Sequence, residues 1–318
     1  MTMPYKRHLI AAALAASVCA APAAQADEFI NILTGGTAGV YYPLGVALSK
    51  IYADKIKGSR PSVQSTKASV ENLNLLQAGK GEIAFTLGDS LGFAWAGDKE
   101  VGFKAPLKKL RGVAAIYPNY IQLVATKASG IKTIADLKGK RISVGAPKSG
   151  TELNTRAVLK AAGLSYSDMG KVEYLSFAES VELMKNRQID ATLQSAGLGV
   201  ASIRDLAATN DITVVAIPAA LVEKIGAPYI SATIPAGTYR GQDADVQTAA
   251  VVNFLVTQTG VKADLVYQMT KAMFENLDTL VAAHKAASAI KLANALKGMP
   301  LPLHPGAERY YKEKGLIK

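Results

Sequence analysis

Short strand-like runs alternate with amphipathic helical patterns over most of this chain. Residues 29–33 form an apolar run, and between residues 40 and 56 apolar side chains recur every three or four positions, as one helix face requires. Further strand-like runs lie at residues 83–87, 121–125, 141–145, 172–177, 190–194, 212–217 and 230–234, with helical patterns at 70–78, 151–162, 178–186 and 200–208. This alternation predicts βαβ units and a largely parallel sheet, that is, an α/β fold.

The pattern changes near residue 238, after which we predict only helices, at residues 244–258, 263–276 and 286–296. A chain of 318 residues suggests about two globular units. Helices that follow a complete α/β region are expected to pack back onto the first unit. Gly-containing segments at residues 128–130 and 235–237 are the best crossing points. We therefore predict a discontinuous first lobe, residues 27–125 and 235–318, and a second lobe, residues 126–234.

The first 26 residues carry the pattern of an export signal. Lys6 and Arg7 form a basic start, residues 9–21 are apolar, and Ala24-Gln25-Ala26 has the small-x-small pattern of a cleavage site. The apolar run is too short to cross about 30 Å of hydrocarbon as a helix. We expect cleavage after Ala26 and a periplasmic protein.

The charge and the cysteine content limit which kinds of site and partner the protein can have. The only cysteine, Cys19, lies in the predicted signal, so the exported chain has neither disulfides nor cysteine metal ligands. The formal net charge of +11 favours anionic partners without identifying them. Two separated histidines after the signal supply few metal ligands, so we expect no metal and no cofactor.

Two glycine-containing loops each follow a predicted strand and precede a predicted helix. Residues 34–43 read Thr-Gly-Gly-Thr-Ala-Gly-Val-Tyr-Tyr-Pro, which matches neither a Walker loop nor a dinucleotide-binding loop. Residues 145–152 read Gly-Ala-Pro-Lys-Ser-Gly-Thr-Glu, in which Ser149 and Glu152 have the spacing of a capping box. Each loop is either a simple turn or an anion site at a helix N-terminus. Ligands of open α/β sheets bind beyond the carboxyl ends of the strands, which favours a shared ligand site.

Taken together, the motifs resemble one known family. The resemblance rests on the 34–43 run and, in order along the chain, on residues 69–73, 136–141, 145–151 and 234–239. The chain resembles the TAXI family, the extracytoplasmic solute receptors of tripartite ATP-independent periplasmic (TRAP) transporters. The resemblance implies a type II periplasmic binding protein with two α/β lobes joined by a hinge. It also implies a receptor that captures glutamate, 2-oxoglutarate or a similar dicarboxylate by hinge closure and delivers it to a TRAP permease. We expect the receptor to be a monomer.

The same resemblance implies a set of ligand-binding residues. Gly36, Thr37 and Tyr41, with Asn72 nearby, would contact the solute from the first lobe. The second lobe would contribute Pro147, Ser149, Gly150 and Thr151. We also place Asp89, Ser90, Gln194 and Tyr229 in the predicted site. The candidates for a carboxylate-binding cation are Lys67, Arg111, Lys148 and Arg156, each of which can equally be a solvated surface charge.

Two other functions were weighed against the receptor. Gly88-Asp89-Ser90-Leu91-Gly92 satisfies the Gly-x-Ser-x-Gly pattern and the Gly-Asp-Ser-Leu motif of secreted esterases. A serine nucleophile needs a histidine base, and neither His284 nor His304 has an aspartate three residues before it. A nucleic-acid binder is also disfavoured, because the basic residues at 104–111 are not interleaved with aromatic residues.

Overall fold

The computed structural model describes residues 28–318, so the predicted export signal and Cys19 lie outside the described residues. The described strands form a single sheet in the order β2-β1-β3-β10-β4-β7-β5-β6, with β8 beside β4 and β9 beside β10. The strands are β1 Glu28–Leu33, β2 Ser59–Gln64, β3 Ile83–Leu87, β4 Leu110–Thr126, β5 Arg141–Ser143, β6 Lys171–Glu173, β7 Ala191–Ala196, β8 Ile212–Val215, β9 Ile230–Ile234 and β10 Val246–Gln258.

Helices cover this sheet on both sides. They are α1 Tyr41–Lys55, α2 Ser69–Gln77, α3 Gly88–Ala96, α4 Gly150–Ala161, α5 Phe177–Lys185, α6 Ala201–Thr209, α7 Ala219–Ile225, α8 Ala263–Phe274, α9 Leu277–Ala283 and α10 Pro305–Glu313. The predicted α/β fold is confirmed, and α8 and α9 pack against α1, near the start of the described chain.

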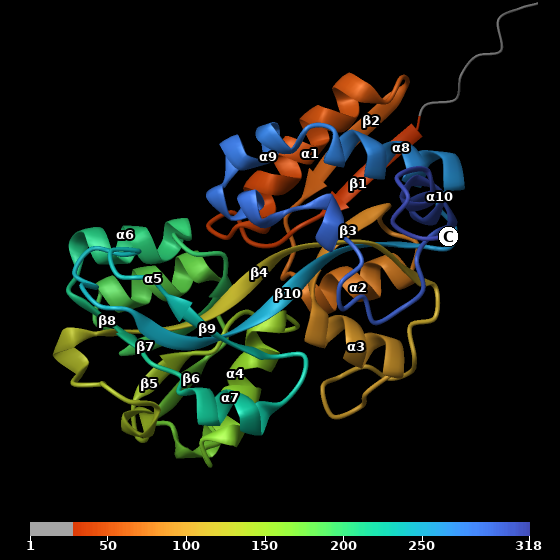
Figure 1. Cartoon of the computed structure of the whole chain (residues 1–318). Helices are drawn as coiled ribbons and strands as arrows, with labels where there is room; N and C mark the ends of the chain where they lie inside the picture. Colours follow the sequence, from red (N-terminus) through yellow and green to blue (C-terminus); the bar gives the residue numbers. More distant parts are fainter. Residues whose placement is uncertain (1–27) are drawn as a thin grey trace, which may run out of the picture.

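The elements separate into two halves joined by two long strands (Figure 1). The first half contains β1–β3 with α1–α3 and α8–α10, and the second contains β5–β9 with α4–α7. Strand β4 pairs with β10 along residues 110–120 and with β7 along residues 120–125. Strand β10 pairs with β9 at residues 246–250 and with β3 at residues 253–256. Both connecting strands therefore contribute to each half.

Strand directions follow from the connections. Strands β1, β2 and β3 are parallel to one another, and so are β5, β6 and β7, because a helix lies between successive strands of a βαβ unit. The long strands β4 and β10 run antiparallel to each other. The carboxyl ends of the parallel strands in both halves face the region between the halves, which is where their loops meet (Figure 1).

Two predicted helices are absent, which corrects the expectation of helices alone after residue 238. Residues 246–258 form β10, whose central segment Ala249–Val251 is buried because neighbouring strands flank it. A short apolar run buried on both faces lacks the alternation that distinguishes a strand from a helix. The predicted helix at 286–296 is replaced by two short 3₁₀ segments, Lys285–Ala289 and Leu292–Asn294.

Apolar side chains are buried on both faces of the sheet. One cluster lies between the second-half strands and α4 and α7, and includes Ile142, Val158 and Val222. A second lies under α2 and α3 in the first half and includes Leu73 and Leu91. The largest cluster extends from α1 and α8 to α5 and α6. Each half thus has its own packed interior, and all three clusters also include residues of the other half, such as Leu87 in the first cluster and Leu153 in the second.

Candidate ligand-binding site

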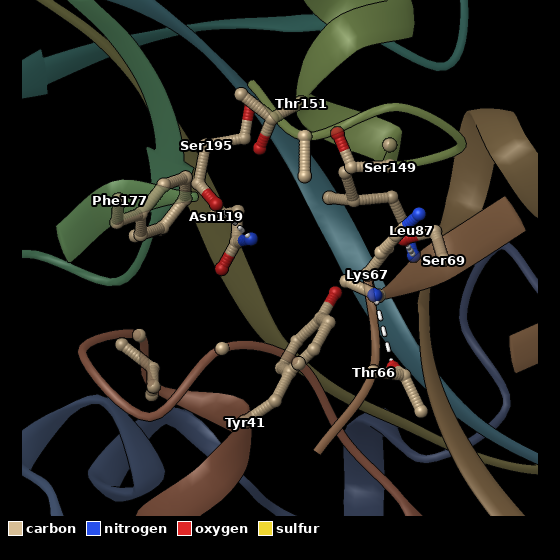
Figure 2. A pocket seen from close by; sticks show the side chains of 18 of the residues that line it. Tyr41, Thr66, Lys67, Ser69, Leu87, Asn119, Ser149, Thr151, Phe177 and Ser195 are labelled. Carbon is tan, nitrogen blue, oxygen red and sulfur yellow. Dashed lines mark hydrogen bonds between the residues drawn. The ribbon is translucent and has the colours of Figure 1, made fainter. Parts of the chain in front are cut away.

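A cleft of about 120 Å³ lies between the two halves and is lined from both (Figure 2). In Figure 2, Tyr41 stands on one side of it, and Thr151, Ser195 and Phe177 stand on the other. The lining residues are Gly35, Gly36, Gly39, Val40, Tyr41, Thr66, Lys67, Ala68, Ser69, Leu87, Tyr117, Asn119, Ala146, Ser149, Gly150, Thr151, Ser176, Phe177, Ser195 and Ala196.

Four helices begin at this cleft. Their first residues, which all line it, are Tyr41 of α1, Ser69 of α2, Gly150 of α4 and Phe177 of α5. The N-terminus of a helix carries unpaired N–H donors and a partial positive charge. Two of the four helices belong to each half, so an anion in the cleft would be held from both sides.

The amides at these N-termini are used differently in the two halves. In the second half, Ser149 Oγ accepts a hydrogen bond from Glu152 N at 3.1 Å, and Ser176 Oγ accepts one from Glu179 N at 3.3 Å. In the first half, the residues before α1 and α2 make no side-chain cap. Within residues 28–318, the amides of Ser69, Val70, Gly150 and Thr151 have no hydrogen-bond acceptor. They are available to a ligand.

The two halves touch beside the cleft. The amide of Glu71, in the first turn of α2, donates to the carbonyl oxygen of Lys148 at 3.1 Å. Gly150 permits this approach, since a Cβ there would lie 2.6 Å from Leu87 Cδ1 and 2.7 Å from Ser69 Oγ. The described arrangement is therefore a closed one.

Polar side chains form a continuous hydrogen-bonded network along the cleft. Asn253, on β10, accepts a hydrogen bond from the Tyr41 hydroxyl through Oδ1 and donates from Nδ2 to Asn119 Oδ1 at 2.8 Å. Asn119 Nδ2 in turn donates to the carbonyl oxygen of Ser195 at 2.8 Å. Burial raises the pKa of Tyr41 far above its usual range, so its hydroxyl stays protonated. Lys67, which is exposed, is the only charged side chain among the described lining residues.

The structure brings five of the predicted site residues together in the cleft. These residues are Gly36, Tyr41, Ser149, Gly150 and Thr151. Thr37 and Pro147 belong to the two loops but do not line the cleft, and Thr37 is exposed. Asn72 lies beneath the cleft, where its Nδ2 donates to the carbonyl oxygens of Thr34 at 2.7 Å and Phe85 at 2.8 Å. For all the residues named in this paragraph, contact with a solute stays a prediction.

The remaining predicted residues lie elsewhere. Gln194 is buried on β7 beside the lining residue Ser195, and its Oε1 accepts from the Ser202 hydroxyl at 2.6 Å. Asp89, Ser90 and Tyr229 do not line the cleft. Of the cationic candidates, Lys67 lines it, whereas Arg111, Lys148 and Arg156 do not. Lys148 takes part in the contact between the halves through its backbone carbonyl oxygen, and its charged side chain does not line the cleft.

Several residues that line the cleft belong to no sequence motif recognised above. Asn119 and Ser195 lie on β4 and β7, far apart in sequence, and only the strand pairing brings them together. Phe177 is different, because Ser176 and Glu179 have the capping-box spacing that marks a helix N-terminus. That signal could have identified the fourth helix that begins at the cleft.

The described residues around Ser90 do not form the serine–histidine arrangement that the hydrolase alternative requires. Ser90 is fully buried, and its Oγ lies 3.4 Å from Asp89 Oδ1. The imidazoles serve elsewhere, since His284 Nδ1 accepts from Ala286 N at 3.1 Å and His304 Nδ1 accepts from Gly306 N at 3.2 Å. Within residues 28–318, Ser90 makes no hydrogen bond to a histidine. The glycine of the motif has a packing role, because a Cβ on Gly88 would lie 2.9 Å from the Phe254 ring.

Residues 28–318 contain no cluster of three or more histidine, cysteine, aspartate or glutamate side chains placed to hold a metal ion. Within the same residues, no helix combines the length and the apolar character that crossing a bilayer requires.

The fold, with its cleft between two α/β halves, is that of type II periplasmic binding proteins. The chain belongs to the NMT1-like family, whose sequence profile matches residues 32–315.

Solved structures of three proteins illustrate the shared fold. The alkanesulfonate-binding protein SsuA of Xanthomonas axonopodis pv. citri, bound to MOPS, is 17% identical, with 93% of this chain and 96% of that chain covered and a TM-score of 0.52. PhnD1 of Prochlorococcus marinus, in complex with methylphosphonate, is 12% identical over 91% and 99%, with a TM-score of 0.59. A putative L-cystine ABC transporter protein of Listeria monocytogenes is 16% identical over 83% and 98%, with a TM-score of 0.52.

Proposed function

We propose that this protein is an extracytoplasmic solute-binding receptor that captures a small anionic solute between its two halves. The observation that carries this proposal is the convergence of four helix N-termini on one cleft. Free amides at α2 and α4 supply donors from opposite halves, and Lys67 adds a positive charge at the rim. The solute would be bound without chemical change.

The cleft volume favours a short solute. A cavity of roughly 150 Å³ accommodates benzene, and the cleft measures about 120 Å³ in its closed arrangement. Glutamate, 2-oxoglutarate and similar acids, which the TAXI resemblance suggests, would require the halves to sit slightly further apart. Smaller acids fit the closed arrangement directly. The structural neighbours are compatible with both the larger and the smaller acids, since SsuA holds MOPS and PhnD1 holds the smaller methylphosphonate.

Solute binding is coupled to closure of the two halves. Bound solute stabilises the closed arrangement because it contacts α2 of one half and α4 of the other. The predicted lobe boundaries, near residues 125 and 234, remain our proposal for the hinge. The pairing of β9 with residues 246–250 of β10 supports a second crossing further along, near residue 251.

The predicted cellular role follows from the sequence. The signal at residues 1–26 would direct export, with cleavage after Ala26, and the monomeric receptor would work in the periplasm. The resemblance to the TAXI family supports a TRAP permease as the membrane partner, whereas an ABC-type permease is the alternative suggested by the structural neighbours.

A thermal-shift screen of residues 27–318 tests the proposal. The protein is unfolded and refolded to remove bound solute, then screened with acetate, L-lactate, methylphosphonate, succinate, L-glutamate and 2-oxoglutarate, with glucose and L-arginine as non-anionic controls. A solute at 100 times its dissociation constant adds about 2.7 kcal/mol, which raises the melting temperature by roughly 4 °C. We expect the shift with one or more acids and not with the controls. A shift only with glucose or L-arginine would contradict an anion receptor.

A further inference from the structure

A buried carboxylate outside the cleft joins the two halves. Asp89, near the start of α3 in the first half, is 2% exposed. Its Oδ2 accepts hydrogen bonds from Asn154 Nδ2 at 2.6 Å and from the Tyr229 hydroxyl at 2.7 Å, and both donors belong to the second half. Its Oδ1 accepts from Ser90 N at 2.6 Å. Within residues 28–318, no cationic side chain forms an ion pair with it.

This carboxylate fixes the orientation of the Asn154 side chain. Asn154 directs its amino group at Asp89 and at the Tyr229 oxygen, which lies 2.8 Å away. The opposite orientation would place the amide oxygen against the carboxylate. With the amide held in this way, Asn154 Oδ1 accepts a hydrogen bond from the hydroxyl of Ser195, a residue that lines the cleft. Asp89 therefore reaches the wall of the cleft through two side chains.

The chain of hydrogen bonds continues along the cleft. The carbonyl oxygen of Ser195 accepts from Asn119, which in turn accepts from Asn253. Tyr41 donates to Asn253 from the other side of the cleft. Displacement of Asn154 would thus release Ser195 and disturb a network that includes three lining residues.

The cost of burying Asp89 depends on the arrangement of the halves. A buried carboxylate is destabilising unless hydrogen-bond donors replace its water. Burial raises the pKa of Asp89, and the donors from Tyr229 and Ser90 oppose that rise. Because Asn154 and Tyr229 lie in the second half, their compensation exists only when the halves are closed.

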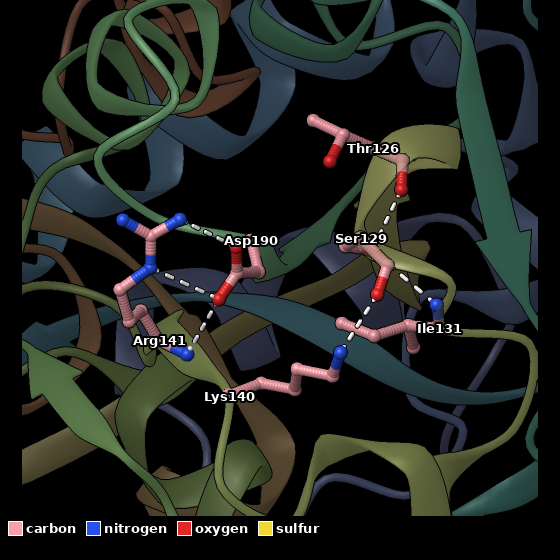
Figure 3. Close-up of polar contacts among 6 residues, drawn as sticks. All are labelled: Thr126, Ser129, Ile131, Lys140, Arg141 and Asp190. Atoms are coloured by element: carbon pink, nitrogen blue, oxygen red, sulfur yellow. Dashed lines mark hydrogen bonds and ion pairs between the residues drawn. The ribbon is translucent and has the colours of Figure 1, made fainter.

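A partly buried carboxylate, Asp190, shows the contrast. Asp190 receives hydrogen bonds from Arg141 at 2.6 and 3.1 Å, and both residues lie within the second half (Figure 3). Arg141 and Asp190 form an ion pair, and this ion pair needs no residue of the first half. The Asp190 carboxylate is therefore satisfied within its own half.

We propose that Asp89 is a positioning residue that holds the two halves closed and, through Asn154 and Ser195, supports the wall of the solute cleft. The inference rests on the proposed receptor function but concerns a residue that does not line the cleft. It explains why Asp89 is buried without a cation and why two of its donors, Asn154 and Tyr229, come from the opposite half.

The distance between the halves is the quantity to measure. Residues 27–318 contain no native cysteine, so spin labels can be attached at Lys50→Cys in α1 and Gln188→Cys after α5, both exposed positions in opposite halves. Interspin distances are measured by pulsed electron paramagnetic resonance without solute and with 10 mM L-glutamate or 10 mM methylphosphonate. The test variants are Tyr229→Phe, which removes one hydroxyl, and Asp89→Asn, whose amide would direct an N–H at another donor.

Two variants within the second half provide matched controls. Tyr166→Phe removes a hydroxyl that donates to Glu152 at 2.8 Å, and Asp190→Asn neutralises the carboxylate of the Arg141 pair. A hydrogen bond to a charged group is strong enough that losing it should shift the closed-to-open ratio about tenfold. We expect that loss in both test variants and wild-type distances in both controls. Melting curves confirm that all four variants fold.

Three outcomes decide the matter. A reduced closed population in Tyr229→Phe and Asp89→Asn, with unchanged controls, supports the proposal even where neither probe binds. Distance distributions equal to wild type in the test variants overturn it. A wild-type protein with no closed population under any of these conditions also overturns it. Failure of the receptor function itself is distinguishable, because it would appear as an acid screen without any thermal shift.

Discussion

The two halves contribute to the cleft by the same strand–loop–helix arrangement, yet they treat the helix N-termini in opposite ways. In the second half, Ser149 and Ser176 cap α4 and α5 with their own hydroxyls. In the first half, α1 and α2 follow Val40 and Ala68, which provide no side-chain acceptor. The second-half helices are stabilised by these side-chain caps, whereas the first-half helices lack them, although free amides remain in both halves, such as those of Ser69 and Gly150. The first half is therefore where we expect an anion to bind before closure.

Backbone geometry beside the cleft does not follow this division between the halves. Ala68, before α2, has φ 69° and ψ −146°, a conformation that only glycine adopts readily. Lys148, before α4, has φ 62°, and its carbonyl oxygen reaches α2 in the first half. Unfavourable backbone conformations thus occur on both sides where the halves meet.

The largest expected effect comes from blocking the contact between the halves. Gly150→Ala places a Cβ 2.6 Å from Leu87 Cδ1 and 2.7 Å from Ser69 Oγ, so the closed arrangement must open slightly. Overpacking of this kind costs about 1–3 kcal/mol, which corresponds to a loss of solute affinity of roughly tenfold to a hundredfold. Isothermal titration with the best acid of the thermal-shift screen measures it.

Gly92→Ala is the matched control for this experiment. It adds the same methyl group to α3 in the first half, where no atom lies within 4 Å of the new Cβ. Its affinity should equal that of wild type. If Gly150→Ala binds as tightly as Gly92→Ala, the contact between α4 and the first half does not limit closure.

A smaller effect is expected from relaxing the backbone at α2. Ala68→Gly removes the penalty of the left-handed conformation, and we expect the unfolding free energy to rise by about 1 kcal/mol. Urea unfolding measures it. Ala78→Gly, at the opposite end of the same helix, where φ is −84°, should instead lower stability by up to about 1 kcal/mol. Equal effects of the two substitutions would show that Ala68 is not strained.

Local patterns predicted much of the fold and part of the cleft. The glycine loops at 34–43 and 145–152 were recognisable because glycines between a strand and a helix leave N-terminal amides open, and Gly36, Tyr41 and Gly150 do line the cleft. The strand at Val246–Gln258 was mistaken for a helix because a central strand buried on both faces has no alternation.

The rest of the site depends on long-range pairing. Asn119 and Ser195 meet because β4 and β7 are adjacent, and no spacing within the sequence reveals this. Asp89 and Tyr229 were predicted as cleft residues, and the structure instead joins them to Asn154 behind the Ser195 wall. Polar residues with a possible function can be identified from the sequence. Whether they line the cleft or lie behind its lining residues depends on tertiary packing.

The smallest effect concerns acid sensitivity, which should differ between the halves. Hydrogen bonds hold the pKa values of Asp136, Asp168 and Glu179 below their usual range, and the Arg141 hydrogen bonds do the same for Asp190; all four lie in the second half. A lowered pKa stabilises the fold above the unfolded-state pKa of about 4, and this contribution is lost as the pH falls further. In the first half the pKa of Asp89 is raised, so acid removes no stabilisation at that residue. Among the described carboxyl groups of that half, only Glu313 has a lowered pKa, because it accepts a hydrogen bond from Tyr267.

We therefore expect the second half to lose hydrogen-exchange protection first between pH 5 and pH 3. Exchange measured by mass spectrometry, corrected for the intrinsic rate at each pH, should show a larger loss in residues 131–143 and 163–180 than in residues 28–56. Asp136→Asn should remove part of the pH response around residues 132–137, because its carboxylate accepts from Lys132 N at 3.0 Å and Thr133 N at 2.8 Å. A uniform loss over both halves would mean that they unfold as one unit, and that the difference in capping has no consequence for stability.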